Sequence, residues 1–411
     1  MEKFEIPLDI PEVKIEDVAL NKKGDIIISV QSKVKGTKCR KCGRTITKHH
    51  GCDRQINLRH LPILGRKAYI RIRPSRYQCP YCDNNPTTTQ RLPWYDQRSP
   101  HTKAYEKHIL LLVVNSTVED VSIKEDLGYE AVMGIINRHI KYKQDWAEIN
   151  KLDVIGIDEI SLKKGHKDFV TIVTGRIGES TVILGVLQDR KKSTVKEFLQ
   201  EIPIRLRRNI IAVCSDMYEG YVNAAKEVFG KKVVIIDRFH VAKLYRKSLD
   251  SLRKKELKRL KKELPEAEYK KLKGAMWILR KKKDKLSDDD LKVMKLLFKH
   301  SPQLEKAYTL CSDLTQIFEE DISKYKAKRK IKNWMKRVNK SGLSCFNTFL
   351  GTLEKYTDEI TNYFHDRQTS GFVEGLNTKI KVIKRRCYGI ININHLFQRI
   401  YLDLHGYNVY V

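Results

Sequence analysis

The stretch "LDVIGIDEISL" (residues 152–162) lies near the middle of a 411-residue chain and ends an apolar run on two carboxylates, Asp158 and Glu159. A short run of Val and Ile bounded by polar residues is typical of a buried β-strand. Because side chains alternate along a strand, Asp158 and Glu159 are expected on opposite sides of it. A lone aspartate at a strand end is more often a turn or cap residue, so a functional interpretation of Asp158 requires partners.

The chain is strongly basic, with 81 Lys and Arg residues, 50 Asp and Glu residues and a formal net charge of +31. Such a surplus favours a polyanionic partner, through electrostatic steering and counterion release. The longest apolar runs, such as ILLLVV (residues 109–114), are too short to span a membrane, and the acidic, proline-broken beginning does not resemble a secretory signal. We therefore expect a nucleic-acid partner and no membrane partner.

The length of the chain predicts two or three domains, and the sequence pattern changes along it. Residues 1–95 carry two CxxC pairs and short strand patterns, and residues 100–145 predict three short helices. Residues 150–240 alternate strands and helices, which predicts a mixed sheet with helices packed on it. Residues 241–365 are helical and Lys-rich, and residues 366–411 contain the last predicted helix. The predicted fold class is mixed α+β in several domains.

Two CxxC pairs predict a metal site in the first region: CRKC, with Cys39 and Cys42, and CPYC, with Cys79 and Cys82. Four thiolates in two such pairs can form the shell of one tetrahedral, structural Zn²⁺. The unpaired use of nine cysteines fits metal binding in a reducing compartment better than a disulfide framework. The alternative is four unrelated buried cysteines. Residues between the pairs could also replace a ligand: His49, His50, Cys52 and His60.

The second region has the pattern of a helix-turn-helix. Thr117 can cap a second helix, with Asp120 completing a capping box, and Gly128 suits a tight turn before a third helix. A basic helix after such a turn is the element that enters the DNA major groove. The alternative is a helical linker or a dimerisation bundle. The residues predicted to contact DNA from the third helix are Arg138, Lys141 and Lys143.

Two further carboxylates occupy places comparable to that of Asp158. Asp216 follows the apolar run NIIAVCS and precedes a predicted helix, and Glu374 lies one turn into a helix that Thr369 or Ser370 can cap. Each has a structural alternative, an N-cap for Asp216 and a helix-dipole carboxylate for Glu374. Converging from two strands and a helix, the three carboxylates can hold two Mg²⁺ (or Mn²⁺) ions about 4 Å apart, which promote in-line displacement at phosphorus.

The helix that carries Glu374 has two adjacent stripes at helical spacing. An apolar stripe is predicted to pack on a core, and consists of Val373, Leu376, Ile380 and Ile383. The neighbouring stripe presents the carboxylate of Glu374 and then an amide and ammonium groups. This order suits a metal ligand followed by phosphate contacts along a DNA backbone. The predicted DNA contacts on this helix are Asn377, Lys381, Lys384 and Arg385.

In order, the CxxC module, the helix-turn-helix and the motifs GIDE, SDMYEGY, DRFHV and EGLNTKIK resemble the DDE transposases of bacterial insertion sequences, specifically the ISL-three family. The resemblance covers essentially the whole chain. It implies an RNase H-like core formed by residues 150–240 and 366–411, interrupted by an insertion domain at residues 241–365. It also implies a prokaryotic, nucleoid-associated protein of the cytoplasm. The implied DDE triad is Asp158, Asp216 and Glu374.

The same resemblance implies a D-x-x-H signature after the fifth strand, formed by Asp237 and His240. We expect His240 beside the active site, where it can hydrogen-bond a phosphate or a metal-bound carboxylate. The alternative is a structural histidine that closes the joint between strand and helix.

The insertion is basic, with fifteen Lys or Arg and five Asp or Glu residues between 251 and 285. Because the insertion emerges between Asp216 and Glu374, we expect this segment to contact phosphates, although such a run is usually a solvated face. Trp277 and Trp334 could stack on an unpaired base, although tryptophans are more often part of a core.

The sequence therefore predicts a DNA transposase that binds terminal inverted repeats, hydrolyses a phosphodiester and joins the freed end to target DNA. Two ends must be brought together, so a homodimer or a larger assembly on DNA is expected. The alternatives are a domesticated DNA-binding regulator without cleavage and a structure-selective nuclease on the same fold.

Overall fold

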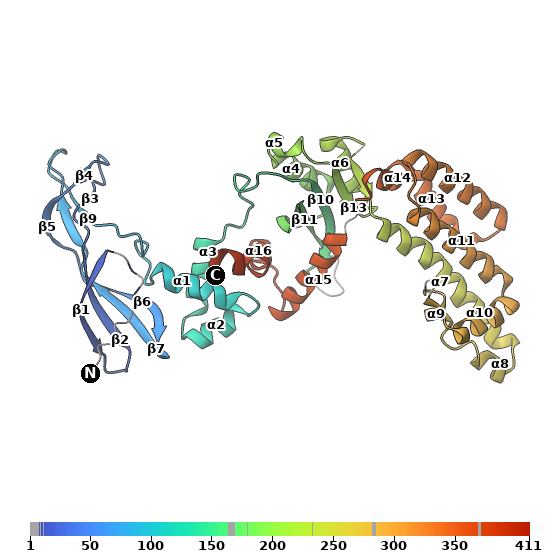
Figure 1. Cartoon of the computed structure of the whole chain (residues 1–411), viewed down its shortest axis with the longest axis horizontal. Coiled ribbons are helices and arrows are strands. Elements are labelled where there is room, and N and C mark those ends of the chain that lie inside the picture. Colours follow the sequence, from blue (N-terminus) through green and yellow to red (C-terminus); the bar gives the residue numbers. More distant parts are fainter. Residues whose placement is uncertain are drawn as a thin grey trace. The chain divides into compact units, whose positions relative to one another are not determined.

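The structure is a computed structural model that describes residues 8, 10, 12–162, 169–178, 180–231, 233–281, 285–368 and 371–411, without the side chains of Asp366, Phe372 and Glu374. The chain divides into two compact units, Met1–Lys141 with Tyr401–Val411, and Tyr142–Ile400. We expected the core to include residues 401–411 and the insertion to be separate from it. Instead, the last residues belong to the first unit, and the insertion and the sheet form a single unit (Figure 1).

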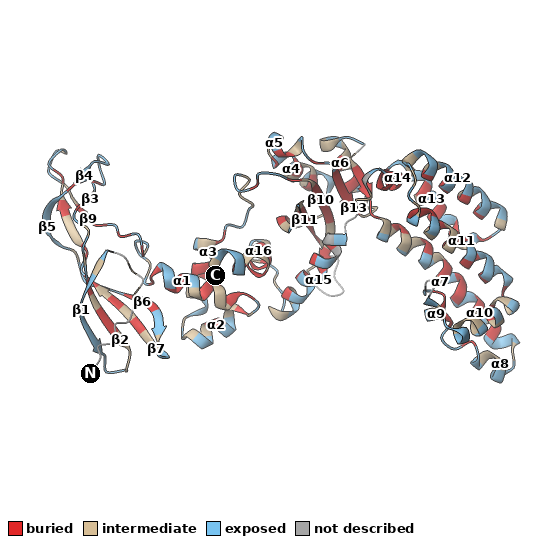
Figure 2. Ribbon diagram, viewed as in Figure 1, coloured by how far each residue is buried: buried red, intermediate tan, exposed pale blue. Residues whose placement is uncertain are grey.

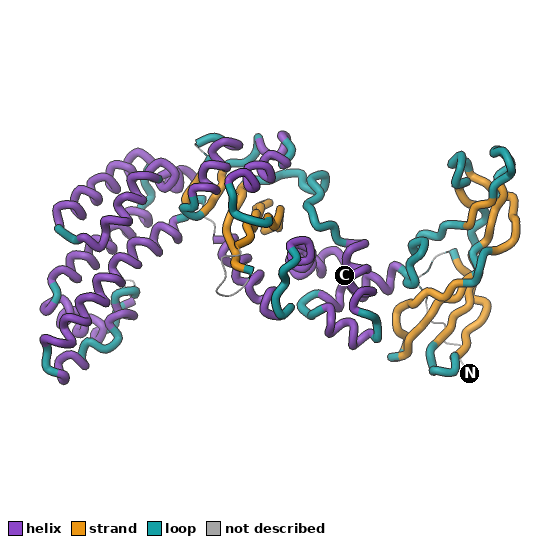
Figure 3. The backbone as a smooth tube through the Cα atoms, turned by 180° about the vertical axis from the view of Figure 1, so that it is seen from behind, coloured by secondary structure: helices purple, strands orange, loops and turns teal. Residues whose placement is uncertain are grey.

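The first unit begins with β-strands in three small sheets (Figure 3). In β7, Ala68, Ile70 and Ile72 are buried and alternate with more exposed residues, which is the pattern typical of a strand with one buried face. The sheets have the orders β1-β2-β7-β6, β5-β8-β9 and β3-β4. The strands are β1 (Val13–Leu20), β2 (Ile26–Ser32), β3 (Thr37–Lys38), β4 (Thr45–Ile46), β5 (Lys48–Cys52), β6 (Ile56–Ile63), β7 (Arg66–Ile72), β8 (Ser75–Gln78) and β9 (Thr87–Thr89).

Three helices follow in the first unit: α1 (Lys103–Val113), α2 (Val118–Glu125) and α3 (Tyr129–His139). Their shared core also includes Leu402 from the far end of the chain, on α16 (Ile393–Tyr410). Asp403 accepts a hydrogen bond from the backbone amide of Asn115 at 2.9 Å, at the joint between α1 and α2. The carboxyl-terminal residues therefore stabilise the three-helix unit.

The second unit contains the predicted mixed sheet, in the order β12-β11-β10-β13-β14. The first three strands form an antiparallel meander, and β13 and β14 extend it in parallel to β10. All five strands lie within residues 150–240, where the sequence predicts alternating strands and helices: β10 (Val154–Ser161), β11 (Phe169–Ile177), β12 (Ser180–Leu187), β13 (Ala212–Ser215) and β14 (Val234–Ile236).

Helices follow or cover these strands: α4 (Lys192–Glu201), α5 (Ile204–Arg207), α6 (Glu219–Phe229) and α15 (Gly371–Arg386). The insertion is helical, as expected, and starts with the long helix α7 directly after β14. Its helices are α7 (Arg238–Glu263), α8 (Glu266–Lys270), α9 (Ala275–Ile278), α10 (Asp288–His300), α11 (Pro302–Glu319), α12 (Lys324–Ser341), α13 (Asn347–Lys355) and α14 (Thr357–Asp366).

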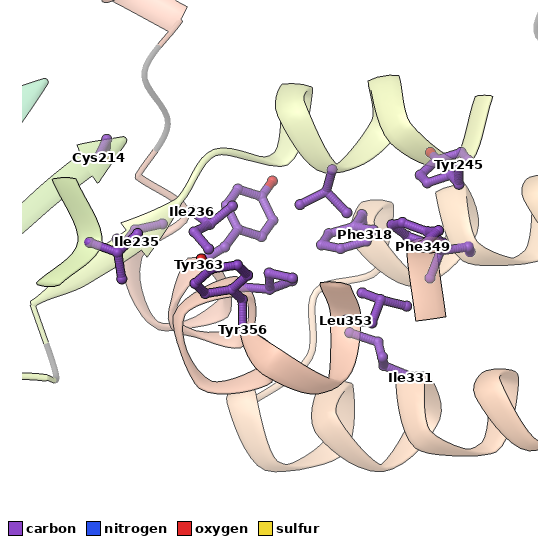
Figure 4. Close-up of a cluster of buried hydrophobic side chains, with 14 of the residues drawn as sticks. Cys214, Ile235, Ile236, Tyr245, Phe318, Ile331, Phe349, Leu353, Tyr356 and Tyr363 are labelled. Carbon is purple, nitrogen blue, oxygen red and sulfur yellow. The ribbon is translucent and has the colours of Figure 1, made fainter. Parts of the chain in front are cut away.

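The hydrophobic core of the insertion continues into the sheet without a break. Figure 4 shows Ile236 of β14 beside Tyr363 of α14, with Phe318 of α11 close by. Asn362 of α14 ties the helix to the edge strand, because its Nδ2 donates to the carbonyl oxygen of Val234 at 2.6 Å. The insertion is therefore anchored directly at the edge of the sheet.

Candidate functional sites

Aspartates lie at the same level on three neighbouring parallel strands. Asp158 lies inside β10, which continues to Ser161 and does not end at the carboxylate, whereas Asp216 and Asp237 directly follow β13 and β14. Ile157 of β10 lies beside Ser215 of β13, so the next residues on these strands are Asp158 and Asp216. Ser215 also lies beside Ile236 of β14, which Asp237 follows. Because the carboxyl ends of parallel strands meet at one edge, residues distant in the sequence are brought together here.

The carboxyl groups of Asp158 and Asp216 are electrostatically unfavourable as a charged pair. Burial is the main reason why the pKa of each is raised. The charge of Asp158 raises the pKa of Asp216 further, while the electrostatic effect of His240 lowers the pKa of both aspartates. Two partly buried, like-charged carboxylates are relieved by a bound divalent cation, and their oxygens are ligands that Mg²⁺ prefers.

Hydrogen bonds orient both aspartates. Oδ1 of Asp158 accepts from the backbone amide of Glu159 at 2.7 Å, and Oδ2 accepts from Nδ2 of Asn377 at 2.5 Å. Oδ1 of Asp216 accepts from the backbone amide of Tyr218 at 2.9 Å, in the turn before α6. The N-cap considered as the alternative for Asp216 is not formed, because the N-cap of α6 is Tyr218 and Asp216 lies in the turn before it.

The helix α15 places Asn377 against Asp158. All four residues of the predicted apolar stripe, Val373, Leu376, Ile380 and Ile383, are buried. Asn377 is 5% exposed, and its Oδ1 has no hydrogen-bond partner among the described residues. We expected Asn377 to contact DNA. Its hydrogen bond to Asp158 shows that it also orients this carboxylate, which helical spacing alone did not reveal. Glu374 lies on α15, but its side chain, like Thr369 and Ser370, lies outside the described residues.

The basic residues of α15 lie beside the end of β10. Nζ of Lys384 donates to the carbonyl oxygen of Ser161, and burial lowers the pKa of Lys384. The charge of Lys381 lowers the pKa of Asp158, against the dominant effect of burial. Lys381, Lys384 and Arg385 line an open hollow of about 530 Å³ together with Ser161, Leu162, Tyr388 and Gly389.

Glu159 has a partner of its own, away from Asn377. Its carboxylate pairs with the guanidinium of Arg190 at 3.0 Å, and that guanidinium lies 4.9 Å from the ring centre of Tyr218 and 5.0 Å from that of Phe169. Asp158 instead contacts α15, in agreement with the predicted alternation along the strand. Nothing in the sequence spacing indicated Arg190.

His240 lies in the first turn of α7, directly after its N-cap. Asp237 is 3% exposed, and its Oδ1 accepts from the backbone amide of Phe239 at 2.6 Å. This cap fixes the start of α7, and places the half-buried imidazole of His240 where its charge acts on Asp158 and Asp216. The fold thus brings His240 near the two carboxylates. Among the described residues, no hydrogen bond joins His240 to Asp158 or Asp216.

The four cysteines of the CxxC pairs come together in the first unit. Ligand atoms of Cys39, Cys42, Cys79 and Cys82 all lie within 4.8 Å of one another, which suits one tetrahedral ion. Backbone amides of Cys42 and Lys41 lower the pKa of Cys39 to about 6, so a thiolate is available. The proposed substitutes lie elsewhere; His60, for example, is hydrogen-bonded through Nδ1 to Oγ1 of Thr102 at 2.9 Å.

The three helices have the predicted local signals, with two differences. Thr117 and Asp120 form the capping box, but the left-handed residue of the turn is Asp126 (φ 50°) rather than Gly128. The third helix ends at His139, so Lys141 and Lys143 lie beyond it and not on it. Ile140 is buried and extended, which ends the helix before the two lysines.

Arg138 lies on the third helix but binds a buried carboxylate. Its guanidinium contacts Oε1 of Glu106 at 2.5 Å, and Nε2 of His139 contacts Oε2 of Glu106 at 2.6 Å. Burial of Glu106 would raise its pKa, but hydrogen bonds from His101, His139 and Arg138 together lower it. Part of the basic character predicted for this helix is therefore neutralised within the unit.

The two tryptophans of the insertion have different environments. Trp334 is 1% exposed and donates from Nε1 to the carbonyl oxygen of Leu310 at 2.7 Å, so it belongs to the core and cannot stack on a base. Trp277 is 62% exposed, with the guanidinium of Arg280 lying 5.8 Å from its ring centre. Of the two, only Trp277 retains the predicted stacking role.

Among the described residues, no helix combines the length and the apolar character that crossing a membrane requires.

Comparison with known proteins gives consistent matches. Residues 155–400 match a family described as "Transposase", and residues 90–140 match the "Helix-turn-helix domain of transposase family ISL3". The chain is 25% identical over 364 residues to the transposase for insertion sequence element IS1001 of Bordetella parapertussis, covering 88% of this chain and 87% of that protein. It is 22% identical over 397 residues to the transposase for IS1557 of Mycobacterium tuberculosis, covering 90% and 86%.

Proposed function

The chain belongs to the ISL3 family of transposases, and from this premise we propose that it binds the terminal inverted repeats of an insertion sequence and catalyses metal-dependent cleavage and strand transfer. The observation that carries the chemistry is that Asp158 and Asp216 come directly after Ile157 and Ser215, which are paired on adjacent parallel strands. Burial and mutual repulsion raise the pKa of Asp216, as expected of a carboxylate whose natural partner is a cation.

Asp158 and Asp216 fit Mg²⁺ or Mn²⁺, since their oxygens are hard ligands at a solvent-accessible sheet edge. Glu374, by its place on α15, is the proposed third ligand. Bound metal ions would supply Lewis-acid stabilisation of charge on the attacking and leaving oxygens. The five-strand order and the helices around it support an RNase H-like core as the scaffold of this triad.

Other residues of the chain orient the carboxylates and the DNA. Asn377 holds Oδ2 of Asp158 through its amide, which fixes the carboxylate while leaving Oδ1 of Asn377 for a donor from substrate or water. We propose that the imidazole of His240, which acts electrostatically on both carboxylates, hydrogen-bonds a phosphate or a metal-bound carboxylate. Lys381, Lys384 and Arg385 surround a hollow next to β10, and we propose that they contact the phosphates flanking the cleaved bond.

End recognition is proposed for the first unit. The cysteine cluster fits structural Zn²⁺, because four soft thiolates from two CxxC pairs match its tetrahedral preference. The three-helix unit would place α3, with Arg138, Lys141 and Lys143 at or after its end, against the terminal repeat. Two ends must be paired, so we propose a homodimer or larger assembly on DNA. The expected location is the nucleoid in the prokaryotic cytoplasm.

The decisive experiment is an assay with DNA that carries the element's ends, a target plasmid and Mg²⁺. Asp216→Ala should abolish cleavage and joining while end binding remains. The matched control is Asp153→Asn, which changes a carboxylate in the same region that is paired with Lys151 at 3.0 Å and precedes β10. Unimpaired cleavage by the Asp216→Ala protein would refute the assignment.

The same assay separates the alternatives. A regulator without cleavage would bind the ends but leave them intact with Mg²⁺ or Mn²⁺. A structure-selective nuclease would cut branched DNA without requiring the repeat and would join nothing. Cleavage at the ends followed by covalent joining to the target is the result expected here.

A further inference from the structure

The helix α12, in the insertion, has a solvent face rich in lysine and arginine and without acidic residues. Its eighteen residues contain nine Lys or Arg and no Asp or Glu. The opposite face is apolar and buried, through Ala327, Ile331, Trp334 and Val338. The absence of acidic residues distinguishes α12 from the longer basic segment 251–285, in which carboxylates interrupt the cations. Figure 2 shows the outward side of α12 as exposed.

The basic residues of α12 fall into two groups. On the flanks, cations are neutralised by neighbouring elements: Lys328 pairs with Asp358 at 2.6 Å, Arg337 pairs with Asp313 at 2.6 Å, and Lys330 pairs with Glu320. Between these flanks lie five exposed cations, which we call the crest: Lys326, Arg329, Lys332, Lys336 and Lys340. Within the described part of the chain, no carboxylate forms an ion pair with a crest side chain.

The spacing of the crest makes it continuous. Steps of three, three, four and four residues bring successive side chains to one side of a helix, and Arg329 to Lys340 spans about 16 Å along the axis. A duplex presents one phosphate charge per roughly 1.7 Å of its axis, so a row of this length faces several phosphates. The five like charges repel one another in the free protein, and a polyanion removes that cost.

The crest is held rigidly, which reduces the entropy lost on binding. The Trp334 side chain fixes the buried face, since its indole packs edge-on against Phe346 and Phe349 with ring centres 6.0 and 5.9 Å away. In addition, Lys324 donates from Nζ to Oδ1 of Asn362 on α14, the helix that is tied to β14. The crest is therefore fixed with respect to the edge of the catalytic sheet.

We propose that the crest is a binding surface for the phosphate backbone of duplex DNA, independent of base sequence. This inference rests on the proposed function in one respect: the transposase assignment identifies the polyanion as DNA. Besides its cations, the exposed residues of α12 are Tyr325, Asn333 and Asn339, and the predominance of cations favours backbone contacts over base reading. In contrast, residues 251–285 present cations interspersed with carboxylates, such as Arg259 paired with both Glu256 and Glu263.

The test uses the full chain and a duplex without terminal repeats, with binding followed by fluorescence anisotropy across a salt series. The variant Arg329→Gln/Lys332→Gln/Lys336→Gln should reduce the slope of log Kd against log salt by about 2.7, because each lost phosphate contact removes about 0.9. The matched control changes three exposed lysines of α10 with the same loss of charge: Lys292→Gln/Lys295→Gln/Lys299→Gln.

The control should change the slope much less than the crest variant. Equal slopes for the crest variant and the wild type, or a larger change in the control, would overturn the proposal. Circular dichroism of both variants checks that the helices remain folded. Cleavage of pre-nicked end DNA at low salt should persist in the crest variant, so a failure of the active-site assignment would be seen separately.

Discussion

The amide nitrogen of Asn377 on α15 lies 2.5 Å from Oδ2 of Asp158 on β10, across 219 residues of sequence. This bond joins the two halves of the core that the helical insertion separates. Asp158 is a proposed metal ligand, and a residue that orients such a carboxylate acts through it, so we expect the loss of Asn377 to affect metal affinity as well as rate.

Asn377→Ala should therefore reduce cleavage by about 10–100-fold and weaken Mg²⁺ or Mn²⁺ binding by a similar factor. End-DNA binding without metal should change little. Isothermal titration with Mn²⁺ and a cleavage time course measure the two effects. Val382→Ala, an exposed position on the same helix, is the control. A variant that loses DNA affinity but keeps metal affinity would instead support the direct DNA contact predicted from the sequence.

The raised pKa values of Asp158 and Asp216 predict a stability cost in the absence of metal. Both groups bind their proton more tightly in the folded chain, so they favour folding at low pH, and this contribution is lost as the pH rises through their folded pKa values. At pH 7.5 with EDTA, Asp158→Asn or Asp216→Asn should raise Tm by about 2–4 °C for each kcal/mol gained.

The gain should shrink toward pH 4, where the wild-type groups become protonated, and Mg²⁺ should stabilise only the wild type. Asp358→Asn is the control, and it should lower Tm at pH 7.5, because a hydrogen bond from Lys328 lowers the pKa of Asp358. Thermal melts between pH 4 and 8 provide the measurement. A lower Tm for both active-site variants at pH 7.5 would contradict the electrostatic interpretation.

Zinc removal should unfold the cysteine module locally. Cys39 and Cys79 are buried in a small cluster with Ile46 and Tyr77, which is too small to form a stable core without the ion. Cys79→Ser should reduce bound zinc from about one ion per chain to nearly none, and should expose residues 37–90 to limited proteolysis. Cys52→Ser, at an exposed cysteine outside the cluster, should keep its zinc. Full zinc content in the Cys79→Ser protein would exclude this ligand set.

Glu106 is predicted to hold the three-helix unit together. Its carboxylate is 1% exposed and binds Arg138, His139 and Oγ of Ser99. Glu106→Gln should destabilise the first unit by about 3–5 kcal/mol, because partners of a buried carboxylate are left uncompensated. Glu119→Gln removes the same charge from an exposed position on α2 and should have little effect.

The pH dependence of this effect has the opposite sign to that of Asp158 and Asp216. Hydrogen bonds lower the pKa of Glu106, so its stabilising contribution is present above the unfolded value of 4.5 and is lost as the pH falls below it. Urea denaturation at pH 7 and pH 4 should therefore show a smaller difference between wild type and Glu106→Gln at the lower pH. A difference that grows on acidification would refute the assignment.

Much of the architecture follows from the sequence, because it depends on local pattern. Apolar runs of four to eight residues predict each strand of the five-stranded sheet, and the stripe from Val373 to Ile383 predicts the buried face of α15. The CxxC spacing predicts which four cysteines meet. The two thiolates of one CxxC pair can bind the same ion, and a second such pair completes its tetrahedral shell. These signals are local, and tertiary contacts do not change them.

The assignments that required tertiary structure concern side chains whose partners are distant in sequence. Helical spacing made Arg138 and Asn377 equally suitable for DNA, but Arg138 binds Glu106 and Asn377 binds Asp158. The net charge of +31 follows from composition alone, yet only the packing of α12 shows which cations are paired at its flanks and which five remain at its crest. Composition and periodicity determine which residues can carry charge or enter a core, whereas the partner of a buried or paired group depends on chain segments that only folding brings together.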